Sequence, residues 1–273
     1  MNTRFVVRGL ILALPLAVIG TLIGVAGLRL GGYGGPPLEP TPPPPTIVVP
    51  RGRLPAGVRA FQEWARYRGE SYALAGCGFV LQLADGQAVG VTTAHSVSLG
   101  ESDHPLEQIG LRIAGQDDPV AEFNRLAGPP GRPRTGDDMT VDYLLLHLEQ
   151  PVDASWLLQA DGRGQPQPGE RVVLVSGLAR ADRGQQPILA GTVQSTSNRA
   201  FWVVMDGRFN PGLMSGSPFL SQHTGRVVGM LVAGTLRGGR VLLAAHPIGS
   251  IVRLAQVVAQ FPPLADSFAA GKP

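Results

Sequence analysis

Three short stretches of this 273-residue chain carry side chains that together can do nucleophilic chemistry. Ser215 lies in the turn 212–218, GLMSGSP, and a turn of this composition leaves a hydroxyl exposed. His95 ends the stretch 92–95, TTAH, and Asp142 begins a leucine-rich stretch further on. A base, a carboxylate that orients it and a nucleophile, in the order His, Asp, Ser, form one of the chain orders in which a catalytic triad occurs.

The carboxylate of this set has competitors. Asp142 shares one face of the alternating segment 141–148 with three leucines, and a carboxylate on such a face is costly to bury unless it is paired. A histidine partner is the simplest solution. Asp137 and Asp138 precede the segment in a Gly-Asp-Asp turn, so Asp142 is the preferred candidate.

His95 follows a predicted hairpin, with strands at 78–83 and 88–93 and a turn at 84–87, ADGQ. The second strand delivers His95 at its end, where a side chain can be rigidly aimed. A lone histidine is more often a surface residue or a satisfied core residue, and the chain has four others. The two further motifs are what single out His95.

At these residues the sequence resembles the chymotrypsin-like (trypsin-like) serine peptidases, over roughly residues 75 to 261. The matching features are the TAH stretch after a hairpin, the D-x-x-L-L-x-L pattern at 142–148 and the serine turn. The resemblance implies a serine endopeptidase with His95 as general base, Asp142 as its orienting carboxylate and Ser215 as nucleophile. It implies a protein or peptide substrate.

The same resemblance implies the remaining parts of a site. The oxyanion hole would be formed by the backbone N–H groups of Leu213 and Ser215. The base of the substrate pocket would lie near Phe209, and its wall would be formed by Leu231, Val232, Ala233, Gly234 and Thr235. None of these carries a carboxylate, which argues against a preference for Lys or Arg and leaves a small or aliphatic residue as the expectation.

The chain departs from the family pattern at two positions in the serine turn. Leu213 stands where the family usually has glycine, and leucine resists the positive φ that glycine takes freely. Met214 stands where members activated by cleavage carry Asp, so the chain resembles bacterial members that need no such cleavage. Leu213 supports the alternative hypothesis, a catalytically inactive peptidase-fold binding module tethered to a membrane.

The elements that must position these residues are short strands in two groups, which predicts an all-β fold of two packed barrels with the site between them. The resemblance makes these two six-stranded antiparallel β-barrels of chymotrypsin type with a C-terminal helix. Further strands are expected at 110–114, 119–123, 171–175, 188–197, 201–205, 226–234 and 240–245.

Two helices are expected at the borders of this body. Apolar residues at 58, 61 and 65 have helical spacing and predict a short helix over Pro55–Tyr67. Ser250 is expected to cap a terminal helix whose apolar face includes Ile251 and Leu254, and which ends at Pro262.

The N-terminal region predicts a membrane anchor. Residues 9–28 form an uncharged run long enough, as a helix, to span a bilayer, and Arg4 and Arg8 before it favour a cytoplasmic N-terminus. A cleaved signal peptide is the competing interpretation, but the run exceeds the usual apolar region and no A-x-A site precedes Arg29. The proline-rich segment that follows is interpreted as an extended stalk.

The predicted organisation has four parts. These are a cytoplasmic N-terminus with a transmembrane signal anchor (1–30), a Gly/Pro-rich linker (31–54), a trypsin-like peptidase domain (55–262) and a flexible tail (263–273). The peptidase domain is expected outside the cytoplasm, at the outer face of the cell membrane.

Composition excludes several other classes of protein. Apolar residues make up 44% and charged residues 16%, which suits a packed β-rich domain better than a disordered chain. The net charge is only +3, with no basic stripe, so nucleic acid is not an expected partner. No metal signature is present, Cys77 is the single cysteine, and no cofactor is expected. The α/β-hydrolase class is disfavoured, because it needs G-x-S-x-G and the order Ser, Asp, His, and neither occurs around Ser215.

Overall fold

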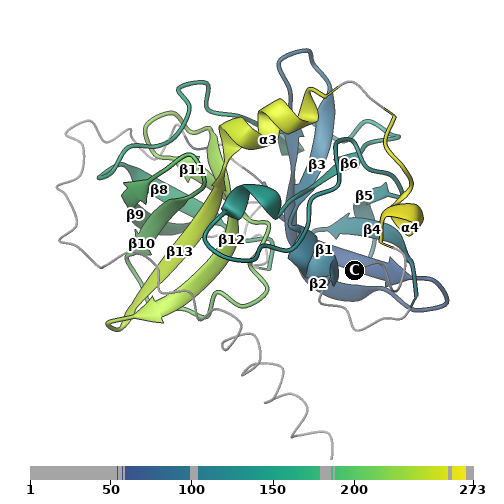
Figure 1. Cartoon of the computed structure of the whole chain (residues 1–273), viewed down its shortest axis with the longest axis horizontal. Coiled ribbons are helices and arrows are strands. Elements are labelled where there is room, and N and C mark those ends of the chain that lie inside the picture. The colour runs from purple at the N-terminus through teal and green to yellow at the C-terminus, as the bar shows by residue number, and fades with distance from the viewer. Residues whose placement is uncertain are drawn as a thin grey trace, which may run out of the picture. The chain divides into compact units, whose positions relative to one another are not determined.

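The structure, a computed structural model, describes residues 54, 57, 59–98, 104–178, 186, 188–257 and 260–268. These residues form an all-β body of two sheets with few helices (Figure 1). None of its helices is long and apolar enough to cross a membrane. The predicted anchor and nearly all of the predicted linker lie outside the described residues, so both stay predictions.

The first sheet, in blue and teal in Figure 1, has a six-strand antiparallel path in the order β5-β4-β1-β2-β3-β6, with β7 parallel to β2. Its strands are β1 (Phe61–Tyr67), β2 (Ala73–Gln82), β3 (Ala88–Thr92), β4 (Leu106–Arg112), β5 (Pro119–Phe123), β6 (Leu144–His147) and β7 (Leu157–Gln159). The strand path is open among the described residues, so this sheet is a half-barrel where a full six-stranded barrel was predicted.

The segment that follows β5 reaches the free edge of β6. Leu126 forms an isolated antiparallel bridge with Leu146: His147 N–H donates to the Arg125 carbonyl at 3.0 Å, and Ala127 N–H donates to the Leu145 carbonyl at 2.7 Å. The backbone groups at the edge of β6 are thus satisfied without a regular strand. Two prolines at 129 and 130 follow at once, and proline cannot donate to a ladder.

The second sheet closes into the predicted six-stranded barrel, in the order β10-β13-β12-β11-β8-β9. Its strands are β8 (Arg171–Val175), β9 (Ile188–Thr196), β10 (Phe201–Met205), β11 (Pro218–Ser221), β12 (Val227–Arg237) and β13 (Arg240–Pro247). Inward-facing side chains such as Phe201, Phe219 and Leu243 fill the barrel, and all three are fully buried. Burial of this kind contributes about 1.5–3 kcal/mol for each large apolar side chain.

The two sheets share a hydrophobic cluster. Phe79 and Leu145 reach it from the first sheet, and Met230 and Ala244 reach it from the second. All four side chains are fully buried. The shared core fixes the two sheets against each other, so residues on facing strand ends can keep a constant separation.

The N-terminal helix predicted over Pro55–Tyr67 was wrong, because Phe61–Tyr67 is strand β1, paired with both β2 and β4. Phe61, Glu63 and Ala65 alternate inward along this strand. A glutamate at the middle buried position breaks the apolar alternation by which a strand is recognised. The remaining apolar residues then show a false helical spacing.

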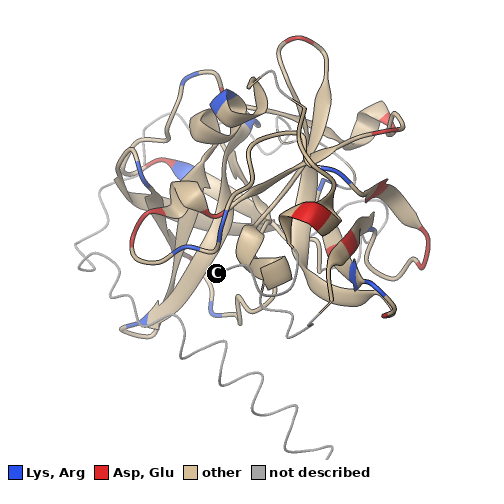
Figure 2. Cartoon of the chain, turned by 45° about the vertical axis from the view of Figure 1, so that its right-hand side comes forward, with Lys and Arg blue, Asp and Glu red and all other residues tan. Residues whose placement is uncertain are grey.

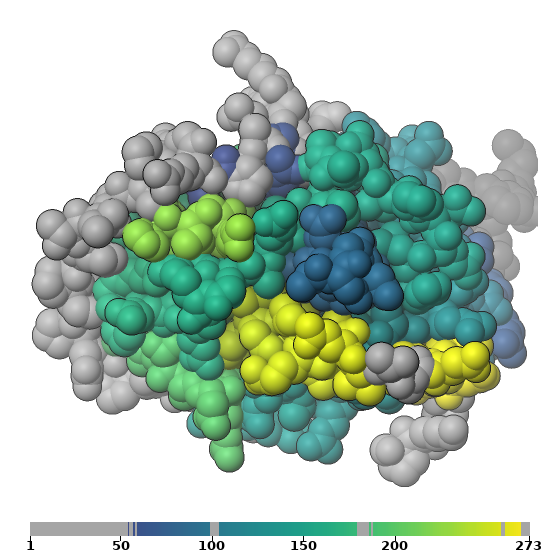
Figure 3. All heavy atoms as spheres, turned by 90° about the horizontal axis from the view of Figure 1, so that it is seen from above, coloured from purple at the N-terminus to yellow at the C-terminus, as the bar shows by residue number. Residues whose placement is uncertain are grey.

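The C-terminal helix is present as α3 (Ile248–Ala255), the yellow segment across the upper face of the body in Figures 1 and 3. It begins at Ile248 with Pro247 as its N-cap residue, so the predicted cap at Ser250 was wrong: Ser250 lies inside the helix. Pro247 ends β13 and its fixed φ favours the turn into a helix. A second short helix, α4 (Leu264–Ser267), follows.

Helix α4 extends the packed body beyond the boundary expected at residue 262. Leu264 is fully buried in the core of the first sheet, and its N–H donates to the Asn124 carbonyl at 2.8 Å. At least residues 264–267 of the predicted tail are therefore ordered against the body.

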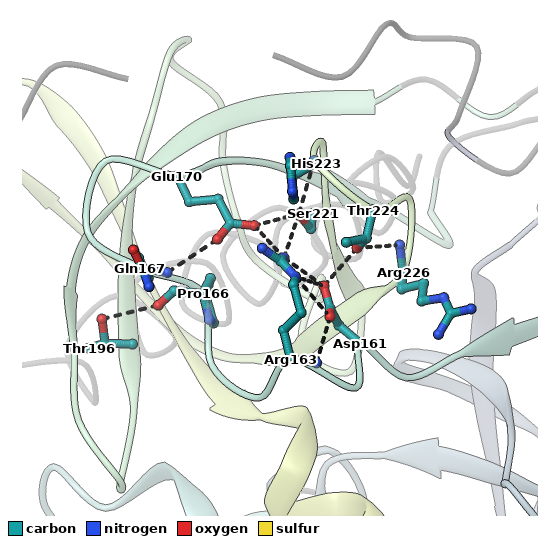
Figure 4. Close-up of polar contacts among 10 residues, drawn as sticks. All are labelled: Asp161, Arg163, Pro166, Gln167, Glu170, Thr196, Ser221, His223, Thr224 and Arg226. Atoms are coloured by element: carbon teal, nitrogen blue, oxygen red, sulfur yellow. Dashed lines mark hydrogen bonds and ion pairs between the residues drawn. The ribbon is translucent and has the colours of Figure 1, made fainter. Parts of the chain in front are cut away.

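Charged residues of both signs are distributed over both sheets (Figure 2). A polar cluster lies in the second barrel, before β8 (Figure 4). Arg163 contacts Asp161 at 2.7 Å and Glu170 at 2.8 Å, and donates to the Ser221 hydroxyl at 3.1 Å. Burial acts to raise the pKa of Asp161, but hydrogen bonds from Arg163 and Thr224 outweigh it and hold this pKa below its ordinary value. The cluster links the loop before β8 to the turn between β11 and β12.

Candidate active site

Ser215 is fixed by backbone contacts on both sides of its turn. Cys77 N–H, on β2, donates to the Ser215 carbonyl at 2.8 Å, and Gly216 N–H donates to the Leu231 carbonyl on β12 at 2.8 Å. Gly216 has a φ of +89°, and a Cβ there would lie 1.8 Å from the Cys77 carbonyl oxygen. Only glycine fits at this contact between the two sheets.

His95 lies just beyond the end of β3. The strand ends at Thr92, and a short helical turn, α2 (Ala94–Ser98), carries His95 toward the second sheet. The ring contacts both other candidates: Nδ1 lies 2.8 Å from Asp142 Oδ2, and Nε2 lies 2.9 Å from Ser215 Oγ. The ring is partly exposed, with 20% of its side-chain surface accessible. It can therefore meet a substrate from solvent.

Asp142 is completely buried and is held by three donors. Its Oδ1 accepts the His95 backbone N–H at 3.0 Å, and its Oδ2 accepts the Arg134 backbone N–H at 3.2 Å besides the His95 ring. Asp138 instead caps the 3₁₀ turn η2 (Met139–Val141) by accepting Thr140 N–H, and Asp137 is exposed. The structure thus brings Asp142, not its competitors, to His95.

The geometry sets the proton positions at the three side chains. The buried Asp142 carboxylate accepts, so His95 Nδ1 carries the proton between them. The Nε2 lone pair then faces the Ser215 hydroxyl and can accept its proton. This arrangement suits general-base activation of a serine.

Leu213 adopts the conformation that its residue type resists. It is the one non-glycine residue with positive φ in the described part of the chain, at +62°. Left-handed backbone costs a leucine about 1–2 kcal/mol. Its side chain is 52% exposed, so apolar burial does not explain the strain. Strain of this kind is typical of functional loops.

The contacts of the serine turn leave two N–H groups available. Met214 N–H donates to the Pro211 carbonyl at 3.1 Å, and Ser217 N–H donates to the Met214 carbonyl at 3.0 Å. Within the described residues, Leu213 N–H and Ser215 N–H donate no hydrogen bond. These are the two donors expected for an oxyanion hole.

The residues expected to form the substrate pocket differ in exposure. Phe209 and residues 233–235 are partly exposed, whereas the side chains of Leu231 and Val232 are only 2% exposed each and belong to the hydrophobic cores. Leu231 N–H donates to the Ser217 carbonyl at 2.8 Å. A substrate could thus meet Leu231 and Val232 only through their backbone.

Sequence reasoning missed two residues behind the serine turn. Cys77 donates its thiol to the Leu213 carbonyl at 3.4 Å as well as its N–H to Ser215. Glu63 is completely buried beside Thr92, whose hydroxyl contacts the Cys77 carbonyl. The sequence offered one indication of Glu63, which is an acid within an apolar segment. The surrounding apolar residues show a false helical spacing, so this indication was not recognised.

Comparisons with known proteins give only distant likenesses. No family model and no curated protein matches the chain. Among solved structures, kallikrein-related peptidase 10 is 19% identical over 71% of this chain and 95% of that chain, with a TM-score of 0.46. The apo MamO protease domain from Magnetospirillum magneticum is 16% identical over 74% and 96%, with a TM-score of 0.44.

Catalytically active tobacco etch virus protease, complexed with product, is 14% identical over 80% of this chain and 86% of that chain, with a TM-score of 0.48. All three structures are peptidases or proteases by name. At such low identities and TM-scores the likeness carries no argument about the activity of this chain.

Proposed function

We propose that the chain is a serine endopeptidase that hydrolyses peptide bonds, with Ser215 as nucleophile, His95 as general base and Asp142 as the carboxylate that orients it. One observation carries the proposal: a continuous series of contacts runs from Asp142 Oδ2 through the His95 ring to Ser215 Oγ, at 2.8 and 2.9 Å. Each group needed for nucleophilic catalysis is within reach of the next.

The chemistry follows from these positions. Ser215 Oγ attacks the peptide carbonyl carbon while His95 Nε2 takes the hydroxyl proton, and the carbonyl electron pair moves onto oxygen. The N–H groups of Leu213 and Ser215 donate to that oxyanion, and loss of one such donor typically lowers the rate roughly 100–1000-fold. His95 then gives its proton to the leaving amine, and water releases the acyl group by the same steps in reverse.

The substrate is a protein or peptide, with a small or aliphatic side chain in the pocket near Phe209. Thr235 and its neighbours on β12 are neutral, so they offer no partner for Lys or Arg. The N-terminal apolar run would tether the domain to the outer face of a membrane. That location is tested by adding a protease to sealed, right-side-out vesicles that carry the intact chain. A domain at the outer face is degraded without lysis of the vesicles.

The activity is tested by exposing the full chain, purified in mild detergent, to a mixed-sequence peptide library beside the Ser215→Ala variant. Cleavage at internal bonds, mapped by mass spectrometry, is expected for the unaltered chain and not for the variant. A folded chain that retains peptides without cleaving them would favour the inactive binding module. Enrichment of Lys or Arg before the cleaved bond would contradict the proposed pocket.

A further inference from the structure

Glu63 is a buried acid that has no cationic partner among the residues that the structure describes. It lies on β1 opposite Gly76 of β2 and Leu111 of β4, and its side chain is completely buried. No ion pair is formed by it among the described residues, and its Oε1 has no hydrogen-bond partner there. A buried carboxylate in this setting is costly, whereas a neutral carboxylic acid is tolerated.

The contacts of Thr92 connect Glu63 to Cys77. Thr92 Oγ1 is 2.7 Å from Glu63 Oε2 and 2.8 Å from the carbonyl oxygen of Cys77. Thr92 has a single hydroxyl proton, and the carbonyl can only accept. An ionised Glu63 also only accepts and would take that proton, whereas a neutral Glu63 can donate to Thr92 and leave the Thr92 proton to the carbonyl. Both contacts are hydrogen bonds at once only when Glu63 is protonated.

This series ends at the serine turn. Cys77 N–H donates to the Ser215 carbonyl at 2.8 Å, and the Cys77 thiol donates to the Leu213 carbonyl at 3.4 Å. A Cβ placed on Gly76 would lie 3.0 Å from Glu63 Oε2 and 3.1 Å from the Ser215 carbonyl oxygen, so the acid and the turn are close neighbours. An ionised Glu63 would place a charge among carbonyl oxygens and accept the Thr92 hydroxyl proton, so that Thr92 would no longer donate to the Cys77 carbonyl.

The surrounding titratable groups favour the neutral form. Burial is the largest cause that raises the pKa of Glu63, hydrogen bonds from Thr92 and Ser96 lower it, and the charge of Asp142 raises it, so that this pKa lies at about 8. Cys77 on β2 and Tyr67 on β1 are the other titratable groups near it, and both are neutral at this pH because burial raises their pKa values to about 11 and about 12. β4 faces it with Leu111, and α2 with the Ser96 hydroxyl, not with His95.

We propose that Glu63 is a positioning residue whose proton holds the Ser215 turn in its reactive geometry, so that loss of this proton loosens the turn and switches the site off. The catalytic part of this inference rests on the proposed function. The acid touches no reacting atom and acts through Thr92 and Cys77.

The test compares the full chain with Glu63→Gln, whose amide can donate to Thr92 as the acid does but cannot titrate. The first measurement is the rate of Ser215 labelling by a fluorophosphonate from pH 6 to 10. The two proteins should react alike near neutrality, and the unaltered chain should be roughly tenfold slower than the variant at pH 9, because ionisation one unit above the midpoint leaves about a tenth neutral. Thr92→Val, which removes the link, should react slowly at every pH.

The second measurement does not depend on activity. Hydrogen exchange of peptides that contain the Cys77 amide, corrected for intrinsic rates, should lose protection above pH 8 in the unaltered chain and keep it in Glu63→Gln. If Ser215 is labelled but the unaltered chain and Glu63→Gln show the same exchange protection and the same pH profile of labelling, the inference is overturned and the proposed function stands. If Ser215 is not labelled but protection is lost above pH 8 in the unaltered chain and kept in Glu63→Gln, the proposed function is overturned and the positioning role stands.

Discussion

The Cys77 thiol lies 3.4 Å from the carbonyl oxygen of Leu213, the residue whose backbone is left-handed at a φ of +62°. The same cysteine bonds the Ser215 carbonyl through its N–H. One residue of the first sheet thus contacts the serine turn of the second on both sides of Met214. The contact with Cys77 thus supports the strained backbone at Leu213 from outside the serine turn. Because the Leu213 N–H is one of the two proposed oxyanion donors, its availability to a substrate depends on this support.

Removing the thiol should weaken that support. Cys77→Ala should lower the fluorophosphonate labelling rate of Ser215 by about threefold, which corresponds to about 0.6 kcal/mol, the range of a weak hydrogen bond. Cys77→Ser keeps a donor and should fall less. Equal labelling of all three proteins would show that the thiol contributes nothing to the turn.

Leu213 should tolerate glycine better than a β-branched residue. Leu213→Gly relieves the left-handed strain but loosens the unfolded chain, so stability should stay within about 1 kcal/mol and labelling should not fall. Leu213→Val should lower labelling by about tenfold, since β-branched residues oppose positive φ by a further 1–2 kcal/mol or so. Stopped-flow labelling rates check both values; a faster valine variant would contradict the assigned backbone.

Two glycines of similar φ separate the effect of backbone strain from that of a steric clash. Gly216 has a φ of +89° and its Cβ would strike the Cys77 carbonyl, whereas Gly86 has a φ of +86° and open space around it. Gly86→Ala should cost about 1 kcal/mol from strain alone. Gly216→Ala should cost clearly more and abolish labelling, because the turn must move. Urea unfolding of both variants measures the difference, and equal losses would refute the contact.

The pH dependence of stability should carry opposite contributions from Glu63 and His246. Glu63 is neutral when folded up to about pH 8 but ionises in the unfolded chain near its ordinary value of 4.5, so its contribution falls as the pH rises through that window. His246 is fully buried, and burial lowers its pKa from 6.5 to about 4, so its contribution falls as the pH drops through that window.

The two contributions oppose each other where the windows overlap, and only that of Glu63 remains from pH 6.5 to 8. The free energy of unfolding should therefore decline by about 1.4 kcal/mol per pH unit in that range. Glu63→Gln should remove this decline. Urea titrations at four pH values measure it, and a decline that persists in the variant belongs to another group.

The sequence predicted those elements of the fold that are determined by residues close together in the chain. The hairpin before His95 and the strands β5 and β10 follow from alternation and turn residues. β11 was missed because its four residues are all buried and it begins with Pro218. The half-barrel form of the first sheet depends on the isolated bridge between Leu126 and Leu146, a long-range contact that no local pattern reveals.

The candidate site divides in the same way. Ser215, His95 and Asp142 stand in short motifs, and the structure brings these three together. Glu63 and Cys77 become visible only when two sheets pack, because their contacts join positions far apart in the sequence. Because Glu63 is a buried acid, it also interrupts the apolar alternation by which strand β1 could have been predicted.

The most direct test of the central claim is the covalent labelling of the full chain by a fluorophosphonate at pH 7.5, with the modified residue located by peptide mass spectrometry. The reagent reacts with a serine only when a base activates it. We expect one modified residue, Ser215, with labelling lost in Ser215→Ala and strongly reduced in His95→Ala. A folded chain that stays unlabelled, or labels equally without His95, would contradict an activated Ser215.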